Sequence, residues 1–167
     1  SAWFGLRREV SSIQHAISYL GEREFRRWAT VALVSNMGKE DPQELLLQSL
    51  IRGRFCELLA PLFDLNTREQ ELFLVGMFSL IDAFLKRPRE EVLENLALGR
   101  PIRDALLGDH NELSPVYDYV IGYETADWGR LDAEAAELGL DDTIAPALYY
   151  EAVRWAEETC QEMACVD

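Results

Sequence analysis

The chain has 167 residues, 49% of them hydrophobic, which is enough for one domain with a substantial core. Its formal net charge of −14 at pH 7 argues against nucleic acid as a partner, because phosphate binding needs a basic surface. The charge is uneven, since residues 1–54 contain eight Lys/Arg and six Asp/Glu, whereas residues 55–167 contain eight and 24. The first third is therefore the part suited to an acidic partner.

The three cysteines, Cys56, Cys160 and Cys165, are too few and too scattered for a disulfide framework or a zinc site. Their pattern predicts a reducing, cytoplasmic location. No apolar run reaches the roughly 18 residues that a membrane span needs, and no signal peptide is visible, so no membrane contact is expected. We also expect no cofactor.

Helix signals follow one another along the first half of the chain. Two helices are expected over "SSIQHAISYLG" and "EREFRRWATVALVSN". The clearest signal is "DPQELLLQSLIRGRFCELLAP", with Asp41 as N-cap, Pro42 in the first turn and Pro61 as the stop. A further capping pattern at Thr67 predicts a helix over residues 68–86.

The second half continues in the same way. Pro88, Pro101 and Pro115 each stand where a helix is expected to begin, and Asp127 is expected to cap the next helix. A long last helix is predicted from about residue 142 to residue 160. Alternating strand patterns are absent. The sequence therefore predicts an all-α, compact domain of eight or nine helices without a sheet.

The segment "LFLVGMFSLIDAFL", residues 72–85, is apolar on every face of a helix and is expected to lie at the centre of the core. Gly76 within it and Gly53 in the preceding helix predict that these two helices cross closely there. Ser79 is expected to satisfy its hydroxyl by bonding to the carbonyl of Val75.

Asp82 is the charged group in this apolar segment and needs a partner. One hypothesis pairs it with Arg52 or Arg54, on the helix expected to face the segment, as a buried structural ion pair. The other pairs it with Lys86, one turn further along its own helix, as an exposed pair worth a few tenths of a kcal/mol. The sequence leaves both open.

One basic and aromatic concentration stands out in this acidic chain, within "EREFRRW". It consists of Arg23, Arg26, Arg27 and Trp28. It could bind an acidic protein or the phosphates of a small nucleotide, with the guanidinium groups gripping oxygens and the indole stacking. The other interpretation, which the composition favours, is a solvated helix face whose arginines pair with neighbouring glutamates.

The segments "SAWFGLRREVSSIQHAISYLG", "QSLIRGRFCELLA", "LFLVGMFSLIDAFL" and "PREEVLENLALGRPIRDALLG" together resemble the HDOD family, the HD-related output domains of bacterial signalling proteins. More narrowly, "YETADWGRLDAEAAELGL" and "YYEAVRWAEE" resemble the branch in which this domain follows an EAL-type cyclic di-GMP phosphodiesterase domain. The resemblance implies a single HD-like helical domain over residues 1–167. It also implies that the chain is a C-terminal part of a larger protein and that the first helices of the module are missing.

The HD metal phosphohydrolases, to which this family is related, hold a divalent metal through a histidine in one helix and a His-Asp pair in the next. By the resemblance, Gln48 stands at the first of these positions, and Ser79 and Leu80 stand at the pair. A leucine cannot bind a metal. The resemblance therefore implies a degenerate metal site and no catalytic residue.

Two hypotheses about function follow. The first is a non-catalytic output or scaffold module that acts through protein–protein contacts in cyclic di-GMP signalling, and is not an enzyme. The alternative is a divergent HD-type phosphohydrolase or nucleotide-binding domain, although no motif of a nucleophilic, zinc or P-loop enzyme is present. The expected partner is a protein, with an adjacent EAL-type domain as one candidate and a second copy of the chain as another.

Overall fold

The structure is a computed structural model, and it describes Ser18, Gly21, residues 42–96 and residues 98–164. The predicted helices of the first forty residues therefore lie outside the described part of the chain. Within that part every regular element is helical, and no strand is found. The α-helices are α3 (Pro42–Leu59), α4 (Glu69–Phe78), α5 (Ile81–Leu85), α6 (Arg89–Glu94), α7 (Arg100–Leu107), α8 (Ser114–Glu124), α9 (Trp128–Leu138) and α10 (Ala145–Ala164).

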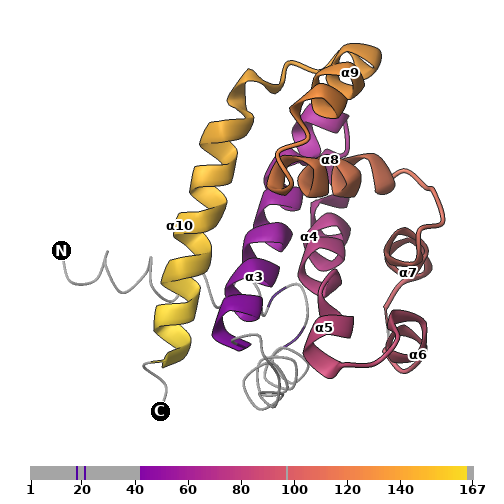
Figure 1. Ribbon diagram of the computed structural model, residues 1–167, viewed down its shortest axis with the longest axis vertical. Helices are drawn as coiled ribbons and strands as arrows, with labels where there is room; N and C mark the ends of the chain where they lie inside the picture. The colour runs from indigo at the N-terminus through magenta and orange to yellow at the C-terminus, as the bar shows by residue number, and fades with distance from the viewer. Residues whose placement is uncertain (1–17, 19–20, 22–41, 97, 165–167) are drawn as a thin grey trace.

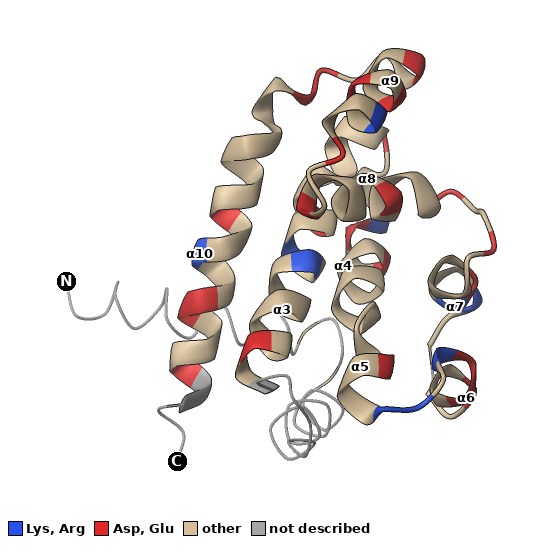
Figure 2. Cartoon of the chain, in the orientation of Figure 1, with Lys and Arg blue, Asp and Glu red and all other residues tan. Residues whose placement is uncertain are grey.

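Helix α3 lies between α10 on one side and α4 on the other, and α7 packs against the far side of α4 (Figure 1). Helix α8 crosses in front of the upper parts of α3 and α4, and α9 packs against α8 (Figure 1). Acidic residues are spread over α6, α9 and α10, while basic residues lie in the middle of α3 (Figure 2). None of the helices described here is long and apolar enough to pass through a bilayer.

The core is centred on α4, in which all residues from Leu72 to Phe78 are buried. This confirms the prediction that the apolar segment is surrounded by other elements. Gly76 confirms the predicted helix crossing, because a Cβ added there would lie 2.4 Å from the backbone oxygen of Arg52. Gly53 makes the reciprocal approach, with an added Cβ at 3.0 Å from the backbone oxygen of Phe73. The two glycines let α3 and α4 touch backbone to backbone.

The prediction of one helix over residues 68–86 is wrong, because the structure divides it into α4 and α5 at Ser79 and Leu80. The Ser79 hydroxyl donates to the carbonyl of Gly76 at 2.6 Å, and not to that of Val75 as expected. The Ser79 backbone N–H also bonds to Gly76, at 3.3 Å, which tightens the last turn of α4. The apolar periodicity of the segment gives no sign of this break.

The remaining helix starts agree closely with the prediction. Pro88 is the N-cap of α6, and Pro101 and Pro115 stand in the first turns of α7 and α8. The Asp127 carboxylate caps α9 by accepting a hydrogen bond from the backbone N–H of Arg130. The last helix differs at its start, since a short 3-10 turn over Asp142–Ile144 precedes α10.

Candidate functional site

Four polar side chains from three different elements meet where α3, α8 and the α4–α5 junction come together. We call them the Arg52 cluster, and they are Gln48, Arg52, Ser79 and Glu124. Gln48 and Arg52 are four residues apart on α3 and so share one face of the helix. Ser79 follows α4, and Glu124 ends α8. The cluster therefore depends on the packing of all three elements.

Arg52 is the centre of this cluster. Its Nε donates to both carboxylate oxygens of Glu124, at 2.8 and 3.1 Å, and its Nη1 donates to the Ser79 hydroxyl at 3.1 Å. The side chains of Arg52 and Glu124 are only 14% and 9% exposed. Because both groups are largely removed from water, each needs the opposite charge of the other to compensate for its lost hydration.

Two opposing effects act on the pKa of the Glu124 carboxyl. Burial raises the pKa of its carboxyl, while the Arg52 charge and hydrogen bonds from Arg52 and Gln48 lower it, and the net direction is upward. Burial likewise raises the pKa of the nearby Cys56 thiol, on which Glu124 acts in the same direction and Arg52 in the opposite one. The thiol is therefore protonated and packs as part of the core.

Two of the three positions assigned to a degenerate metal site thus come together, because Gln48 and Ser79 both contact the Arg52–Glu124 pair. Leu80, the third, is half-buried and packs against the core cluster. In the described residues, no group of three or more His, Cys, Asp or Glu side chains is placed to share a metal ion. The degenerate metal site itself stays a prediction.

The predicted pairing of Asp82 with Arg52 or Arg54 is wrong. Asp82 accepts a hydrogen bond from Nη2 of Arg89 at 3.2 Å and is 39% exposed. Its helix, α5, begins only after the break at Ser79, and Asp82 in the first turn of α5 contacts Arg89 at the start of α6. The alternative partner, Lys86, is instead the left-handed C-cap residue of α5.

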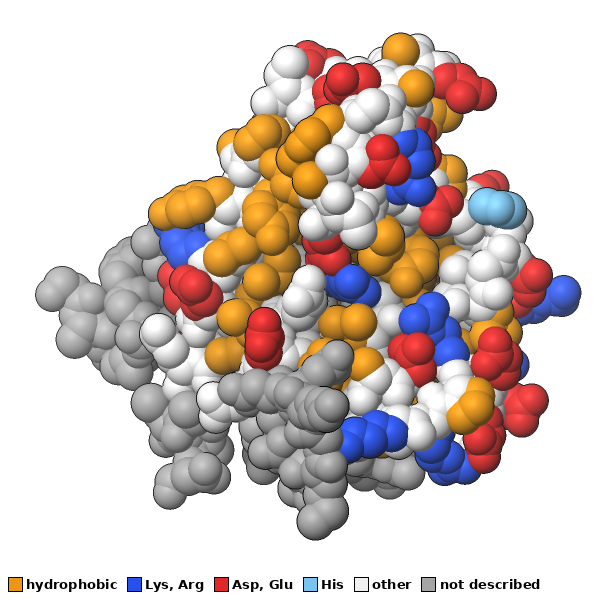
Figure 3. All heavy atoms as spheres, viewed as in Figure 1, with side chains coloured by type: hydrophobic (Ala, Val, Ile, Leu, Met, Phe, Trp, Pro, Cys, Tyr) orange, Lys and Arg blue, Asp and Glu red, His pale blue; other side chains and the backbone are white. Residues whose placement is uncertain are grey.

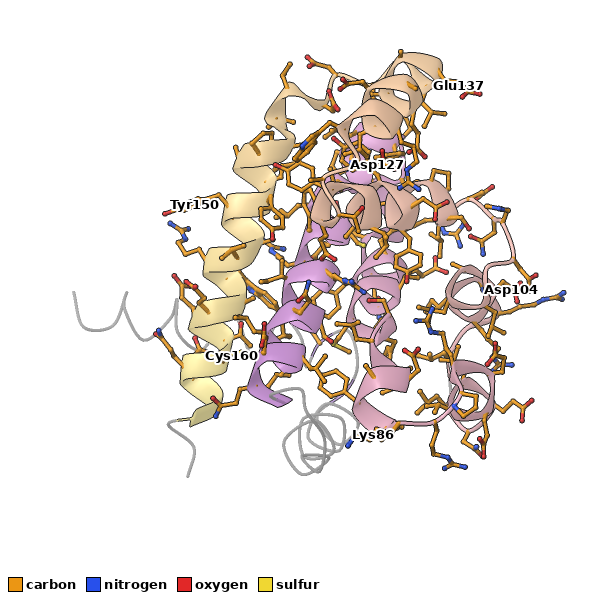
Figure 4. The ribbon with its side chains drawn as sticks, viewed as in Figure 1. Lys86, Asp104, Asp127, Glu137, Tyr150 and Cys160 are labelled. Carbon is orange, nitrogen blue, oxygen red and sulfur yellow. The ribbon has the colours of Figure 1, made fainter. Side chains whose placement is uncertain are left out.

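The two arginines have other carboxylate partners on neighbouring helices. Arg52 binds Glu124, as described above. Arg54 donates to Glu57 at 2.7 Å and to Glu151 of α10 at 3.2 Å, and its guanidinium lies 5.8 Å from the centre of the Trp155 ring. These contacts join α3 to α10. Figure 4 shows the neighbouring α10 residue Tyr150 pointing outward on the opposite side of that helix.

Arg89 is the residue that the sequence analysis missed on the other side of Ser79. Its Nη2 donates to the Ser79 carbonyl at 2.8 Å, and its Nη1 donates to the Leu106 carbonyl at 3.1 Å. Glu124 was missed as well. The carboxylate that follows the apolar stretch "YVIGY" was a usable signal for Glu124, whereas Arg89 follows a helix-starting proline in a run of charges and gave none.

The predicted basic cluster of Arg23, Arg26, Arg27 and Trp28 lies outside the described residues. The structure therefore says nothing of its partner, and both interpretations of it stay open.

Two curated relatives match most of this chain. It is 32% identical over 149 residues to "Cyclic di-GMP phosphodiesterase CdgJ" of Vibrio cholerae, covering 89% of this chain and 34% of that protein. It is 36% identical over 155 residues to "Uncharacterized protein YuxH" of Bacillus subtilis, covering 90% of this chain and 37% of that protein. The chain thus spans about a third of the length of these relatives. No solved structure matches it.

The name of the Vibrio protein overturns the prediction of a non-catalytic module that is not an enzyme, since it is the name of a phosphodiesterase. That prediction depended on ligand positions inside this domain alone. It gave no weight to chemistry in the rest of a longer protein, of which the matched part is about a third.

The resemblance expected from the sequence is confirmed by the comparison with family profiles. The HDOD domain profile matches residues 1–95, which is more than half of the chain and includes α3 to α6. The all-helical fold agrees with this match. The chain belongs to the HDOD domain family.

Proposed function

We propose that this chain is part of a cyclic di-GMP phosphodiesterase. The observation that carries the proposal is the 32% identity to the Vibrio cholerae phosphodiesterase over 89% of this chain. The Bacillus subtilis relative supports the same architecture, since it matches a similar share of the chain and is also much longer. Because the matched part is about a third of each relative, the reaction is proposed for the whole protein that contains the chain.

Within that enzyme the Arg52 cluster fixes how α3, α8 and the α4–α5 junction sit together. A buried Arg–Glu pair with hydrogen bonds to both carboxylate oxygens permits little change of geometry. The domain is therefore suited to present a defined surface to the rest of the protein. An adjacent EAL-type domain, as the resemblance implies, is the partner that we propose for that surface.

A cytoplasmic location belongs to the same proposal. It is supported by the described cysteines, Cys56 and Cys160, which are both free thiols. Burial raises the pKa of the Cys160 thiol to about 11, so this group is also protonated at neutral pH. Cys160 lies on the part of α10 that runs beside α3 (Figure 4).

The test is an assay of the purified natural full-length protein with cyclic di-GMP in the presence of Mg²⁺ or Mn²⁺, with the linear dinucleotide product separated by chromatography. We expect conversion of cyclic to linear dinucleotide. Absence of product with both cations, in a protein shown by circular dichroism to be folded, would rule the proposal out. A parallel assay of residues 1–167 alone shows whether the reaction needs the rest of the protein.

A further inference from the structure

A cavity of about 210 Å³ lies apart from the Arg52 cluster, between the start of α6, the end of α7 and α8. Its polar lining comes from Arg89, His110, Ser114, Tyr117 and Asp118, and its apolar lining comes from the last turn of α7. An engineered cavity of about 150 Å³ holds benzene, so this volume suits a bicyclic ring of purine size. The lining residues at the two ends of this set, Arg89 and Asp118, are 29 positions apart in the chain, so the cavity is a product of the fold.

The polar groups of this cavity have unused hydrogen-bonding capacity. The buried Nε of Arg89 has no partner within the described structure. No described residue forms a hydrogen bond or ion pair with the side chain of His110 or with the carboxylate of Asp118. Burial raises the pKa of the Tyr117 hydroxyl, against the opposing effect of the Arg89 charge, so this group remains a neutral donor and acceptor. Groups of this kind are normally satisfied by a ligand or by water.

The charges of the cavity select among ligands. The Arg89 guanidinium opposes a metal cation. The Asp118 carboxylate and the net charge of −14 oppose a free phosphate. A neutral ring avoids both charge conflicts if it offers hydrogen-bond acceptors to Arg89 and hydrogen-bond donors to Asp118. Guanine has this pattern, because O6 and N7 accept hydrogen bonds, as in arginine–guanine pairs, while its N2 amino group and N1–H donate.

We propose that this cavity binds a guanine base, with Asp118 accepting from N1–H and N2–H and with Arg89 or His110 donating to O6 and N7. The side chain of Leu107 and the ring of Tyr117 supply apolar surface for the faces of the base. His110 is exposed and forms the rim; the pale blue histidine is visible at the surface in Figure 3. This inference rests on the proposed function, because cyclic di-GMP and its linear product are the ligands that would carry the guanine base.

The cavity is separate from the place where the family resemblance locates the metal positions. Gln48 lies on α3, which contributes no lining residue. Arg89 is the link between the two places, since it lines the cavity and also holds the Ser79 carbonyl. Occupation of the cavity by a base would therefore act on the residue that anchors the α4–α5 junction.

The test uses the full 167-residue chain and five probes: guanosine, GMP, the linear guanine dinucleotide, cyclic di-GMP and adenosine. Binding is followed by chemical-shift changes in NMR titrations. We expect guanosine to bind at least tenfold more tightly than adenosine, because adenine offers Asp118 an acceptor at N1 where guanine has a donor. Comparison of the guanine probes then identifies which source of the base binds best. Equal binding of guanosine and adenosine would overturn the proposal.

Two variants complete the test. Asp118→Asn is expected to weaken guanosine binding at least tenfold, since the carboxylate is replaced by a group with a single acceptor oxygen. Asp109→Asn is the matched control, because it makes the same charge change on the adjacent loop outside the lining and should leave binding unchanged. Unaltered binding by Asp118→Asn also overturns the proposal. Hydrolysis of cyclic di-GMP by the wild-type full-length protein is measured separately, so loss of the guanine site and failure of the proposed function are distinguishable.

Discussion

Arg52 of α3 donates hydrogen bonds from its Nε to both carboxylate oxygens of Glu124, at the end of α8, at 2.8 and 3.1 Å. The two residues are 72 positions apart in sequence, so this pair forms only when the domain is folded. Removal of one member leaves the other charge buried and without its partner. Loss of either member is therefore expected to destabilise the fold.

We expect Arg52→Met to destabilise the domain by about 3–5 kcal/mol in urea unfolding, because Glu124 loses the charge that pairs it. The double variant Arg52→Met/Glu124→Leu should recover most of this loss, since no buried charge remains. Arg154→Met is the control, because Arg154 and Glu158 form an exposed pair, and a change within about 0.5 kcal/mol is expected. If Arg52→Met were as stable as wild type, the prediction would be contradicted, and water would be the group that solvates Glu124.

The close approach of α3 and α4 gives a second prediction. Gly76→Ala places a Cβ at 2.4 Å from the Arg52 backbone oxygen, so one helix must move, and we expect a loss of about 3 kcal/mol or more. Gly129→Ala is the matched variant on α9, where the added Cβ meets nothing within 4 Å apart from its chain neighbours and the backbone of its own helix, and it should stabilise the domain by up to about 1 kcal/mol. Chemical denaturation of both variants measures the contrast. Equal effects would contradict the packing described for Gly76.

A third prediction separates the roles of Arg89 and Asp82. Asp82→Asn removes an exposed partner and should reduce the free energy of unfolding by less than about 1 kcal/mol. Arg89→Ala also leaves the carbonyls of Ser79 and Leu106 without their donors, so a loss of about 2–3 kcal/mol is expected. Thermal and urea unfolding of the two variants are to be compared. If both lose the same amount, the ion pair, and not the carbonyl contacts, is what Arg89 contributes.

A fourth prediction concerns alkaline pH. Burial and a 2.9 Å hydrogen bond to Asp142 raise the pKa of Tyr119 above its ordinary value of 10.0. The native state therefore holds this proton more tightly than the unfolded state. Its contribution to stability is fully present below about pH 10 and is lost as the pH rises above that value.

Tyr119→Phe should lower stability by about 1 kcal/mol at neutral pH and make the decline above pH 10 shallower. The remaining decline is attributed to the other groups whose pKa values are raised by burial, namely Cys56, Cys160, Tyr117, Tyr123 and Tyr149. Tyr150→Phe is the control, because this side chain is 68% exposed. Urea unfolding at intervals between pH 7 and 11 measures the slopes. The same slope in wild type and Tyr119→Phe would contradict the prediction.

The helical class and most helix starts could be predicted because their signals are local. A proline in a first turn and a capping aspartate act within a few residues, and Pro88, Pro101, Pro115 and Asp127 all stand where expected. The crossing at Gly76 was also predictable, since a glycine inside a helix carries a cost that close packing explains.

The partners of the charged residues could not be predicted in the same way. One hypothesis paired Asp82 with an arginine of α3 and the other paired it with Lys86, and both treated residues 68–86 as one continuous helix. The structure divides this helix at Ser79 and Leu80, and Asp82 pairs with Arg89. Arg52 finds its partner 72 residues away, where no periodicity in the sequence connects them. Ion pairs between distant segments depend on the packing of several helices at once, so local patterns offer several equal candidates for each charge.

Ser79 has a further consequence. Its hydroxyl accepts a hydrogen bond from Arg52, which also binds Glu124. Its carbonyl accepts a hydrogen bond from Arg89, which also donates to the Leu106 carbonyl. One small residue thus completes a polar bridge that runs from α8 through α3 and the α4–α5 junction to α6 and α7. Glycine at this position would keep the carbonyl contact and lose the hydroxyl contact, so Ser79→Gly would cut the bridge into two halves while leaving the helices that they join in place.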